Sequence, residues 1–241
     1  LARQITPGTK LIVLANLHNP SSAFIDDDQM RRIGELAAAV GATVFVDEVY
    51  LETLFDRRWR SAFFLGENFV VTSSLTKAYG LSGLRCGWIA ACPKLARRMW
   101  DIVDMTYGIP AHTAEQLSVL AFEHLPQIAE RARALLERNR LLLNQFLASH
   151  EKHLACDPSL VGTTVAPRLR HGSAADFCRR LRTEFETAVV PGDFFEAPAC
   201  FRIGIGGLTV PLEEGLAQVS AALEHNARSI RTQNAPGSAR L

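Results

Sequence analysis

The chain has 241 residues, of which 48% are hydrophobic and 21% are charged, a composition typical of one large globular domain or two smaller ones. The formal net charge of +1 gives no strongly basic surface for nucleic acid or an anionic membrane, and no apolar run approaches the roughly 20 residues that span a bilayer. The five cysteines form no CxxC pair, which indicates thiols in a cytoplasmic protein and neither a disulfide framework nor a metal site.

The first half of the chain alternates between strand and helix patterns. Continuous apolar runs predict buried strands, and apolar residues at helical spacing predict one amphipathic helix. The strands are expected at residues 10–17, 42–46, 69–72 and 87–91, and the helix at residues 26–40. This alternation predicts an α/β fold with a mostly parallel, doubly wound sheet, in which binding sites lie at the carboxyl ends of the strands.

The second half of the chain has a different pattern. Helices are predicted at residues 93–105, 111–123 and 126–150, and then short strands and two helices (174–185 and 212–225) follow. We expect a large domain over residues 1–140, which includes the start of the long connecting helix, and a small C-terminal α+β domain over residues 141–231. The polar segment 232–241 is expected to be disordered.

A lysine loop directly follows the third predicted strand. It contains hydroxyl side chains, glycines and an arginine around Lys77. A lysine at this place can form a Schiff base with an aldehyde cofactor. Ser74, Thr76 and Arg85 can bind a phosphate group, with the guanidinium forming a forked contact. An isolated lysine is usually a solvated surface residue, so the neighbouring strand ends must decide between the two interpretations.

Polar residues of distinct types follow the first two strands as well. Asn19 comes after the first strand, and Asp47 and Tyr50 come after the second. Taken one at a time, Asn19 could be a turn residue before Pro20, Asp47 a helix N-cap and Tyr50 a packed ring. If the strands are parallel, however, all three loops lie at one edge of the sheet and can meet one ligand.

With these motifs in this order, the chain resembles the fold-type I, pyridoxal-phosphate-dependent aminotransferases of class I/II, whose large domain has the aspartate aminotransferase type of fold. The resemblance extends from about residue 10 to residue 226. The matching motifs are Asn19-Pro20, Asp47-x-x-Tyr50, Ser74-x-Thr76-Lys77 with Arg85, Pro191-Gly192 with Phe195, and Phe201-Arg202-Ile203-Gly204.

The resemblance implies a role for each matched residue. Lys77 holds the cofactor pyridoxal 5'-phosphate as a Schiff base and later moves a proton, and Asp47 pairs with the pyridine nitrogen. Arg202 binds the substrate carboxylate, with Asn19 close to the substrate. The remaining cofactor-binding roles fall to Asn19 and Tyr50 at the phenolic oxygen and to Ser74 and Arg85 at the phosphate. Tyr79, Trp88 and His18 are expected to be structural.

The function implied by the resemblance is transfer of an amino group between an L-amino acid and a 2-oxo acid. The expected enzyme is a cytoplasmic homodimer with no nucleic-acid or membrane partner. Family members have a long segment before the Asn-Pro motif, whereas only a short segment precedes Asn19-Pro20 here. We therefore expect the sequence to be the C-terminal part of an aminotransferase and to be inactive or weakly active alone.

Two alternatives remain open at this stage. Other fold-type I enzymes, such as a β-eliminating lyase, a decarboxylase or a cyclising synthase, use the same lysine, aspartate and arginine. An aminotransferase-like domain can also act as the effector sensor of a transcription regulator. The residues quoted above are common to all of these possibilities, so they do not separate them.

Overall fold

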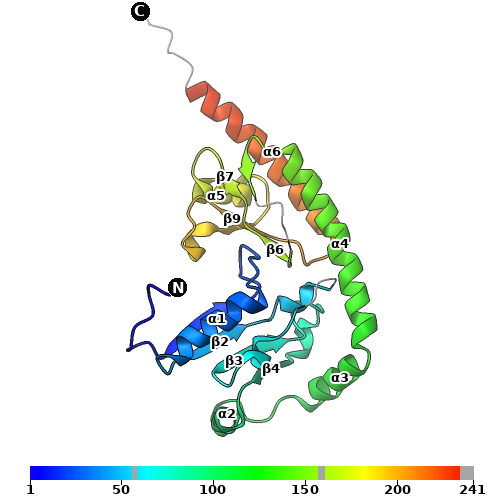
Figure 1. Ribbon diagram of the computed structural model, residues 1–241. Coiled ribbons are helices and arrows are strands. Elements are labelled where there is room, and N and C mark those ends of the chain that lie inside the picture. The colour runs from blue at the N-terminus through cyan, green and yellow to red at the C-terminus, as the bar shows by residue number, and fades with distance from the viewer. Residues whose placement is uncertain (56–58, 157–160, 234–241) are drawn as a thin grey trace, which may run out of the picture. The chain divides into compact units, whose positions relative to one another are not determined.

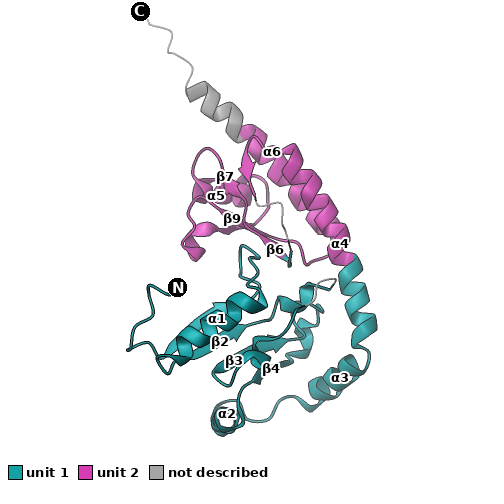
Figure 2. Cartoon of the chain, viewed as in Figure 1, with its two compact units in different colours: residues 1–134, 161–163 teal, residues 135–160, 164–241 magenta. Residues whose placement is uncertain are grey.

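The computed structural model describes residues 1–55, 59–156 and 161–233, and for residues 226–233 only the backbone. The chain forms two compact units, which Figure 2 shows in teal and magenta. Unit 1 comprises residues 1–134 and 161–163, and unit 2 comprises residues 135–160 and 164–241. The elements of each unit are labelled in Figure 1.

Unit 1 is built on a four-stranded sheet in the order β1-β2-β3-β4. The strands are β1 (Leu11–Ala15), β2 (Thr43–Asp47), β3 (Phe69–Ser74) and β4 (Gly87–Ala90). The first three strands are parallel, whereas β4 runs antiparallel to β3. The structure thus confirms the predicted α/β fold with a mostly parallel sheet, and it adds an antiparallel edge strand that the sequence pattern did not specify.

Helix α1 (Asp27–Ala38) packs on one face of this sheet. Asp26 caps the helix by accepting a hydrogen bond from the Gln29 backbone, and the Gln29 side chain returns the bond in a capping box. Met30 and Ala37 of α1 are buried in one core cluster with strand residues such as Val44 and Phe69, as are Ile12, Val46 and Val71. Burial of this apolar surface stabilises the α1–sheet pairing.

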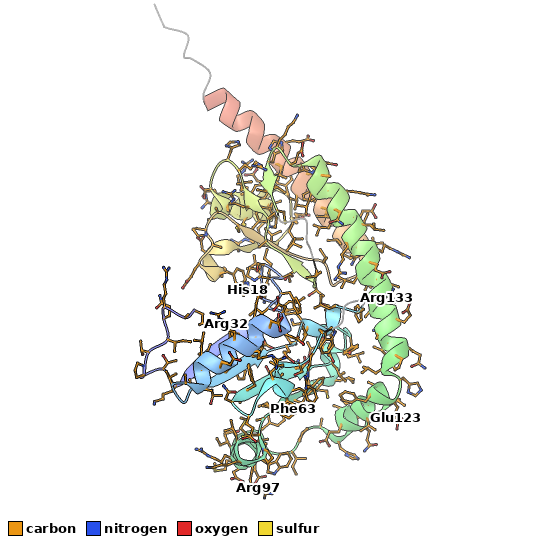
Figure 3. The ribbon with its side chains drawn as sticks, in the orientation of Figure 1. His18, Arg32, Phe63, Arg97, Glu123 and Arg133 are labelled. Carbon is orange, nitrogen blue, oxygen red and sulfur yellow. The ribbon has the colours of Figure 1, made fainter. Side chains whose placement is uncertain are left out.

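Three short 3₁₀ helices and two longer helices complete most of unit 1. The 3₁₀ helices are η1 (Leu51–Thr53), η2 (Ala62–Leu65) and η3 (Ser82–Leu84). Helix α2 (Pro93–Thr106) has no buried residue, and its exposed residues include Arg97, labelled in Figure 3. Helix α3 (His112–Glu123) buries Ser118 and Ala121. Helix α4 (Leu125–Ser149) begins in unit 1 and continues into unit 2.

Unit 2 contains short antiparallel strands, as expected for an α+β arrangement. Strand β5 (Leu154–Ala155) pairs with β7 (Arg168–Leu169), and β9 (Phe201–Gly204) lies between β6 (Thr164–Val165) and β8 (Val190–Pro191). The 3₁₀ helix η4 (Gly192–Phe195) follows β8 directly. Helices α5 (Ala174–Glu184) and α6 (Thr209–Gln233) pack together in this unit.

One buried side chain of α4 fixes the end of β9. The Asn139 amide nitrogen donates to the carbonyl oxygens of Ile205 and Gly207 at 2.8 and 2.7 Å, and its oxygen accepts a bond from Thr209 Oγ1 at 2.8 Å. Asn139 is completely buried, and this set of bonds satisfies its polar atoms. The turn between β9 and α6 is therefore held by α4 within the same unit.

The segment predicted to be disordered, residues 232–241, overlaps the end of α6, because α6 extends to Gln233. From residue 234 on, that prediction lies outside the described residues. Among the helices that the structure describes, none is long and apolar enough to cross a membrane.

Candidate active site

The register of the parallel strands aligns their carboxyl ends. Ala15 of β1 lies beside Asp47 of β2, and Asp47 lies beside Thr72 of β3. Neighbouring strands in a sheet are about 4.8 Å apart, so the loops that follow β1, β2 and β3 leave from one edge of unit 1. Asn19 belongs to the first of these loops, and Tyr50 belongs to the second.

Asp47 is the last residue of β2, and its carboxylate is held in two ways. Oδ1 accepts a hydrogen bond from the backbone nitrogen of Val49 at 3.1 Å and from the hydroxyl of Thr72 at 3.3 Å. The first bond is the local turn contact that a capping aspartate also makes, and the second crosses to the next strand. Asp47 is thus oriented by two donors, which suits a carboxylate that must meet a cation.

Hydrogen bonds within the lysine loop and the burial of its apolar side chains hold the loop in place. Ser74 Oγ accepts a bond from the Thr76 nitrogen at 3.2 Å, and the Leu81 nitrogen donates to the Leu75 carbonyl at 3.0 Å. The apolar residues of the loop, Leu75, Ala78 and Tyr79, are buried in a cluster that also contains Ala121 of α3. These anchors leave Lys77 as an exposed residue of the loop.

The amine of Lys77 reaches toward the loop that follows β2. Lys77 Nζ lies 5.9 Å from the centre of the Tyr50 ring. The Tyr50 ring packs beside the buried side chains of Leu17, Leu51 and Leu54, so its position is fixed by core contacts. The structure therefore brings together two of the residues that the sequence predicts to be functional.

The loop that carries Asn19 is pinned at its base by a buried amide. Asn16 Nδ2 donates to the Ile25 carbonyl, and the Ile25 nitrogen donates back to Asn16 Oδ1, both at 3.0 Å. Pro20 and Ser22, which follow Asn19 in the loop, are also buried. Asn19 is half-buried at the same sheet edge as Asp47.

Arg85 stands at the end of η3 in a left-handed conformation, with φ of 53°. Its guanidinium is exposed, and Nη1 lies 3.4 Å from the Ser82 carbonyl oxygen. The next strand begins with Gly87, which is opposite Ser74 in the β3–β4 register. A Cβ atom at Gly87 would stand 3.2 Å from the Ser73 carbonyl oxygen, so a glycine suits the close approach between Ser74 and the start of β4.

Arg202 lies in unit 2, on the short strand β9. Its guanidinium carbon is 5.1 Å from the centre of the Phe195 ring, a cation–π arrangement. Arg202 also lines an open cavity of about 640 Å³ in unit 2, together with Glu186, Gly204 and Leu208. The predicted site residues are thus six at one edge of unit 1, and Arg202 in unit 2.

Two polar residues next to these positions were missed in the sequence. Thr72 binds Asp47, and Glu48 is 4% exposed, with Oε1 accepting a bond from the Ala62 nitrogen at 2.7 Å. Burial raises the pKa of Glu48 from its ordinary value of 4.5, against the lowering by the bonds from Ala62 and Ser61. A sequence signal for Thr72 was present, because a hydroxyl residue near the end of the third predicted strand lies close to the end of the second strand in a parallel sheet.

The donor set fits pyridoxal phosphate. A primary amine, an oriented carboxylate, a tyrosine ring, a hydroxyl and a guanidinium all stand at one sheet edge in unit 1. The amine can form a bond to the cofactor aldehyde, and the carboxylate can pair with the protonated ring nitrogen. The hydroxyl and the guanidinium can bind the phosphate dianion. Within the described ranges, no group of three or more His, Cys, Asp or Glu side chains could hold a metal ion.

Comparison with known proteins agrees with this chemistry. Residues 1–219 match the family described as Aminotransferase class I and II, so the chain belongs to the class I and II aminotransferases. Members of this family depend on pyridoxal phosphate. The family resemblance that the sequence motifs indicated is therefore confirmed.

Individual relatives share less than a third of their residues with the chain. A capreomycidine synthase of Streptomyces vinaceus is 29% identical over 92% of this chain and 58% of its own length. The crystal structure of a PLP-dependent aminotransferase from Streptococcus suis is 30% identical, with a TM-score of 0.87 over 93% of this chain and 60% of that one. The PLP-dependent cyclase OrfR gives a TM-score of 0.81 at 27% identity, over 93% and 61%. The chain thus spans about three fifths of each.

Proposed function

We propose that this protein is a pyridoxal-phosphate-dependent aminotransferase that moves an amino group between an L-amino acid and a 2-oxo acid. The observation that most supports the proposal is the placement of Asp47 at the end of β2 and of Lys77 in the loop after the adjacent parallel strand β3, in a chain of the aminotransferase family. Because the chain spans about three fifths of its relatives, the activity is proposed for the protein from its complete coding region.

The bound cofactor supplies an electron-withdrawing ring that stabilises negative charge at the substrate α-carbon. Lys77 Nζ would hold the cofactor through its aldehyde group, and as a free amine it would accept the proton from the substrate α-carbon. Asp47 would keep the ring nitrogen of the cofactor protonated, and the bonds from Val49 and Thr72 hold its carboxylate in place.

The other proposed roles concern orientation. Asn19 and Tyr50 would donate to the phenolic oxygen of the cofactor, and Ser74 and Arg85 would bind its phosphate. Arg202 binds the substrate carboxylate through a bidentate contact that a lysine could not copy. We also propose a homodimer in the cytoplasm, supported by the family membership and by the odd number of cysteines without a CxxC pair.

The proposal is tested by absorbance spectroscopy of the purified protein with pyridoxal phosphate. We expect a visible absorbance band that changes with one member of an amino-acid panel. Reduction with borohydride should leave the cofactor permanently attached to Lys77, as peptide mass spectrometry would show. Lys77→Ala should lose the band and reduce turnover by roughly 10²–10⁴-fold. Lys94→Ala, at an exposed position on α2, is the matched control. Fixation elsewhere, or turnover retained by Lys77→Ala, would refute the proposal.

A cyclising synthase is a second candidate, because a capreomycidine synthase and a PLP-dependent cyclase are among the similar proteins. Both candidates use the same lysine and the same cofactor, so product analysis must separate them. Conversion of a 2-oxo acid into its amino acid indicates transfer, whereas a cyclic product formed without consumption of a 2-oxo acid indicates the synthase.

A further inference from the structure

A buried glutamate directly follows Asp47 at the end of β2. Val44 and Val46 of β2 are buried in the core cluster that also holds residues of α1. Because alternate residues of an extended chain point to the same side, Glu48 takes the next position in this row. Glu48 is buried like the two valines, so an otherwise apolar row ends in a carboxyl group next to the candidate site.

The carboxyl group of Glu48 holds the beginning of η2. Glu48 Oε1 accepts a hydrogen bond from the backbone nitrogen of Ala62 at 2.7 Å, and Ala62 is the first residue of η2. Ala62 is itself buried in the same core cluster as Val44 and Val46. The first N–H groups of a helix have no partner within the helix, so the carboxyl group supplies the acceptor that this nitrogen needs.

A carboxyl group is costly at this position. Burial raises the pKa of Glu48 above its ordinary value of 4.5. A leucine would continue the apolar row without that cost, but it would leave the Ala62 nitrogen buried and without this acceptor. The bond also fixes which residue faces the core. Because a shift by one residue reverses the two faces of a strand, holding Glu48 on the core side keeps Asp47 on the other side.

The backbone around Asp47 is held on both sides, whereas its side chain is held less tightly. The Asn16 nitrogen donates to the Asp47 carbonyl oxygen at 2.9 Å, and the Glu48 nitrogen donates to the Thr72 carbonyl oxygen at 2.8 Å. The side-chain bonds to Asp47 Oδ1, from Val49 and Thr72, are longer, at 3.1 and 3.3 Å. Bonds of this length orient a carboxylate weakly, so its direction depends on the backbone from which it projects.

We propose that Glu48 is a positioning residue for Asp47, and that its bond to the Ala62 nitrogen fixes the end of β2 so that the Asp47 carboxylate can pair with the ring nitrogen of pyridoxal phosphate. The inference rests on the function proposed above. In this role Glu48 touches neither cofactor nor substrate, and it acts by holding the backbone beside Asp47.

The test uses apoprotein from the complete coding region and measures the Kd for pyridoxal phosphate by equilibrium titration, with the melting temperature of each variant in parallel. Glu48→Leu removes the acceptor, whereas Glu48→Gln keeps an oxygen for the Ala62 nitrogen. Both changes are also made together with Asp47→Ala. Glu67→Leu, at an exposed glutamate, is the control for the substitution itself.

A second variant breaks the same bond from the donor side. Ala62→Pro removes the N–H group at the first position of η2, where proline is tolerated. The preceding residue, Ser61, already has the extended conformation that proline requires, with ψ of 137°. This variant keeps the test decisive if Glu48→Leu does not fold.

A positioning role predicts that Glu48→Leu and Ala62→Pro each raise the Kd by about 5- to 30-fold, as expected for the loss of one hydrogen bond to a buried carboxyl group. The pH at which the visible absorbance band changes should shift in the same variants. Glu48→Gln should stay within about twofold of wild type, because it keeps the bond. In the Asp47→Ala background, Glu48→Leu should change the Kd by less than about twofold, since the group that it positions is gone.

Two results would overturn the inference. If Glu48→Leu or Ala62→Pro lowers the melting temperature but binds the cofactor as tightly as wild type, the bond serves only stability. If Glu48→Leu raises the Kd equally with and without the Asp47 side chain, it does not act through Asp47. A wild-type protein that forms no band on Lys77 would instead refute the proposed function itself, so the two failures are distinguishable.

Discussion

Thr72 and Asp47 are joined by a hydrogen bond between neighbouring parallel strands, with Thr72 Oγ1 3.3 Å from Asp47 Oδ1. The two residues are register partners at the carboxyl ends of β3 and β2. A β-branched residue suits the strand, and its hydroxyl supplies the carboxylate with a donor that does not depend on the local turn. Thr72 is therefore part of what orients the carboxylate proposed to meet the cofactor ring.

Replacing Thr72 with valine should weaken cofactor binding and leave the sheet intact. Thr72→Val keeps the branched shape and removes the donor, so we expect the Kd for pyridoxal phosphate to rise about fivefold. Thr72→Ser should restore most of the affinity, and Thr43→Val, at the other end of β2, is the control for the substitution itself. Equal affinities for wild type and Thr72→Val in an equilibrium titration would show that this bond does not matter.

Replacing Arg202 with lysine should separate substrate binding from cofactor binding. The guanidinium rests on the Phe195 ring and presents a planar fork, which a lysine ammonium cannot reproduce although it keeps the charge. We expect KM for the amino acid to rise by at least about tenfold, with an unchanged Kd for pyridoxal phosphate. Arg182→Lys, at an exposed position on α5, is the control. An equal loss of both affinities would argue against a carboxylate-binding role.

The pH dependence of stability should reveal the buried carboxyl of Glu48. Its pKa is raised in the folded state by burial, so the folded protein holds this proton more tightly than the unfolded chain does. The resulting stabilisation is fully present below the unfolded pKa near 4.5 and is lost as the pH rises through the folded pKa. Glu48→Gln removes this titration and keeps an acceptor for the Ala62 nitrogen.

The measurement is the free energy of unfolding of both proteins in urea from pH 4.5 to pH 7.5. We expect the stability of wild type relative to Glu48→Gln to fall as the pH rises across this range. Glu67→Gln, at an exposed site, should follow wild type throughout. A stability difference between wild type and Glu48→Gln that does not change with pH would contradict the direction of the shift.

The elements that the sequence predicted well are those whose pattern is set by burial. The apolar run at Phe69–Val71 becomes the buried part of β3, and Met30 and Ala37, which the helical spacing predicts on one face, are buried in α1. Strands of two residues, such as β5, are too short to show any period, and the direction of β4 follows from a tertiary pairing with β3.

The predictions for the candidate site can be divided in the same way, into residues that a local pattern reveals and residues that it does not. Residues that follow a strand end, such as Asn19, Asp47 and Lys77, could be found from the chain alone, because parallel strands place their ends together. Tyr79 was expected to be structural, and its ring is buried with Leu75 and Ala78 in the core cluster of the lysine loop. The roles of the matched residues and the domain boundaries stay predictions.

Two glycines in helices should respond oppositely to the same substitution. Alanine is normally the better helix former by about 0.8–1 kcal/mol. A Cβ atom at Gly34 of α1, however, would stand 2.6 Å from Cε2 of Phe69, a ring that is itself buried in the core of unit 1. At Gly215 of α6 an added Cβ would meet nothing within 4 Å.

We therefore expect Gly34→Ala to lower the free energy of unfolding by about 1–3 kcal/mol, because the Phe69 ring must shift within a packed core. Gly215→Ala should raise it by about 0.5–1 kcal/mol through helix propensity and a less flexible unfolded chain. Urea unfolding of both variants provides the comparison. If Gly34→Ala were as stable as wild type, the packing of α1 against Phe69 would have to be looser than the structure indicates.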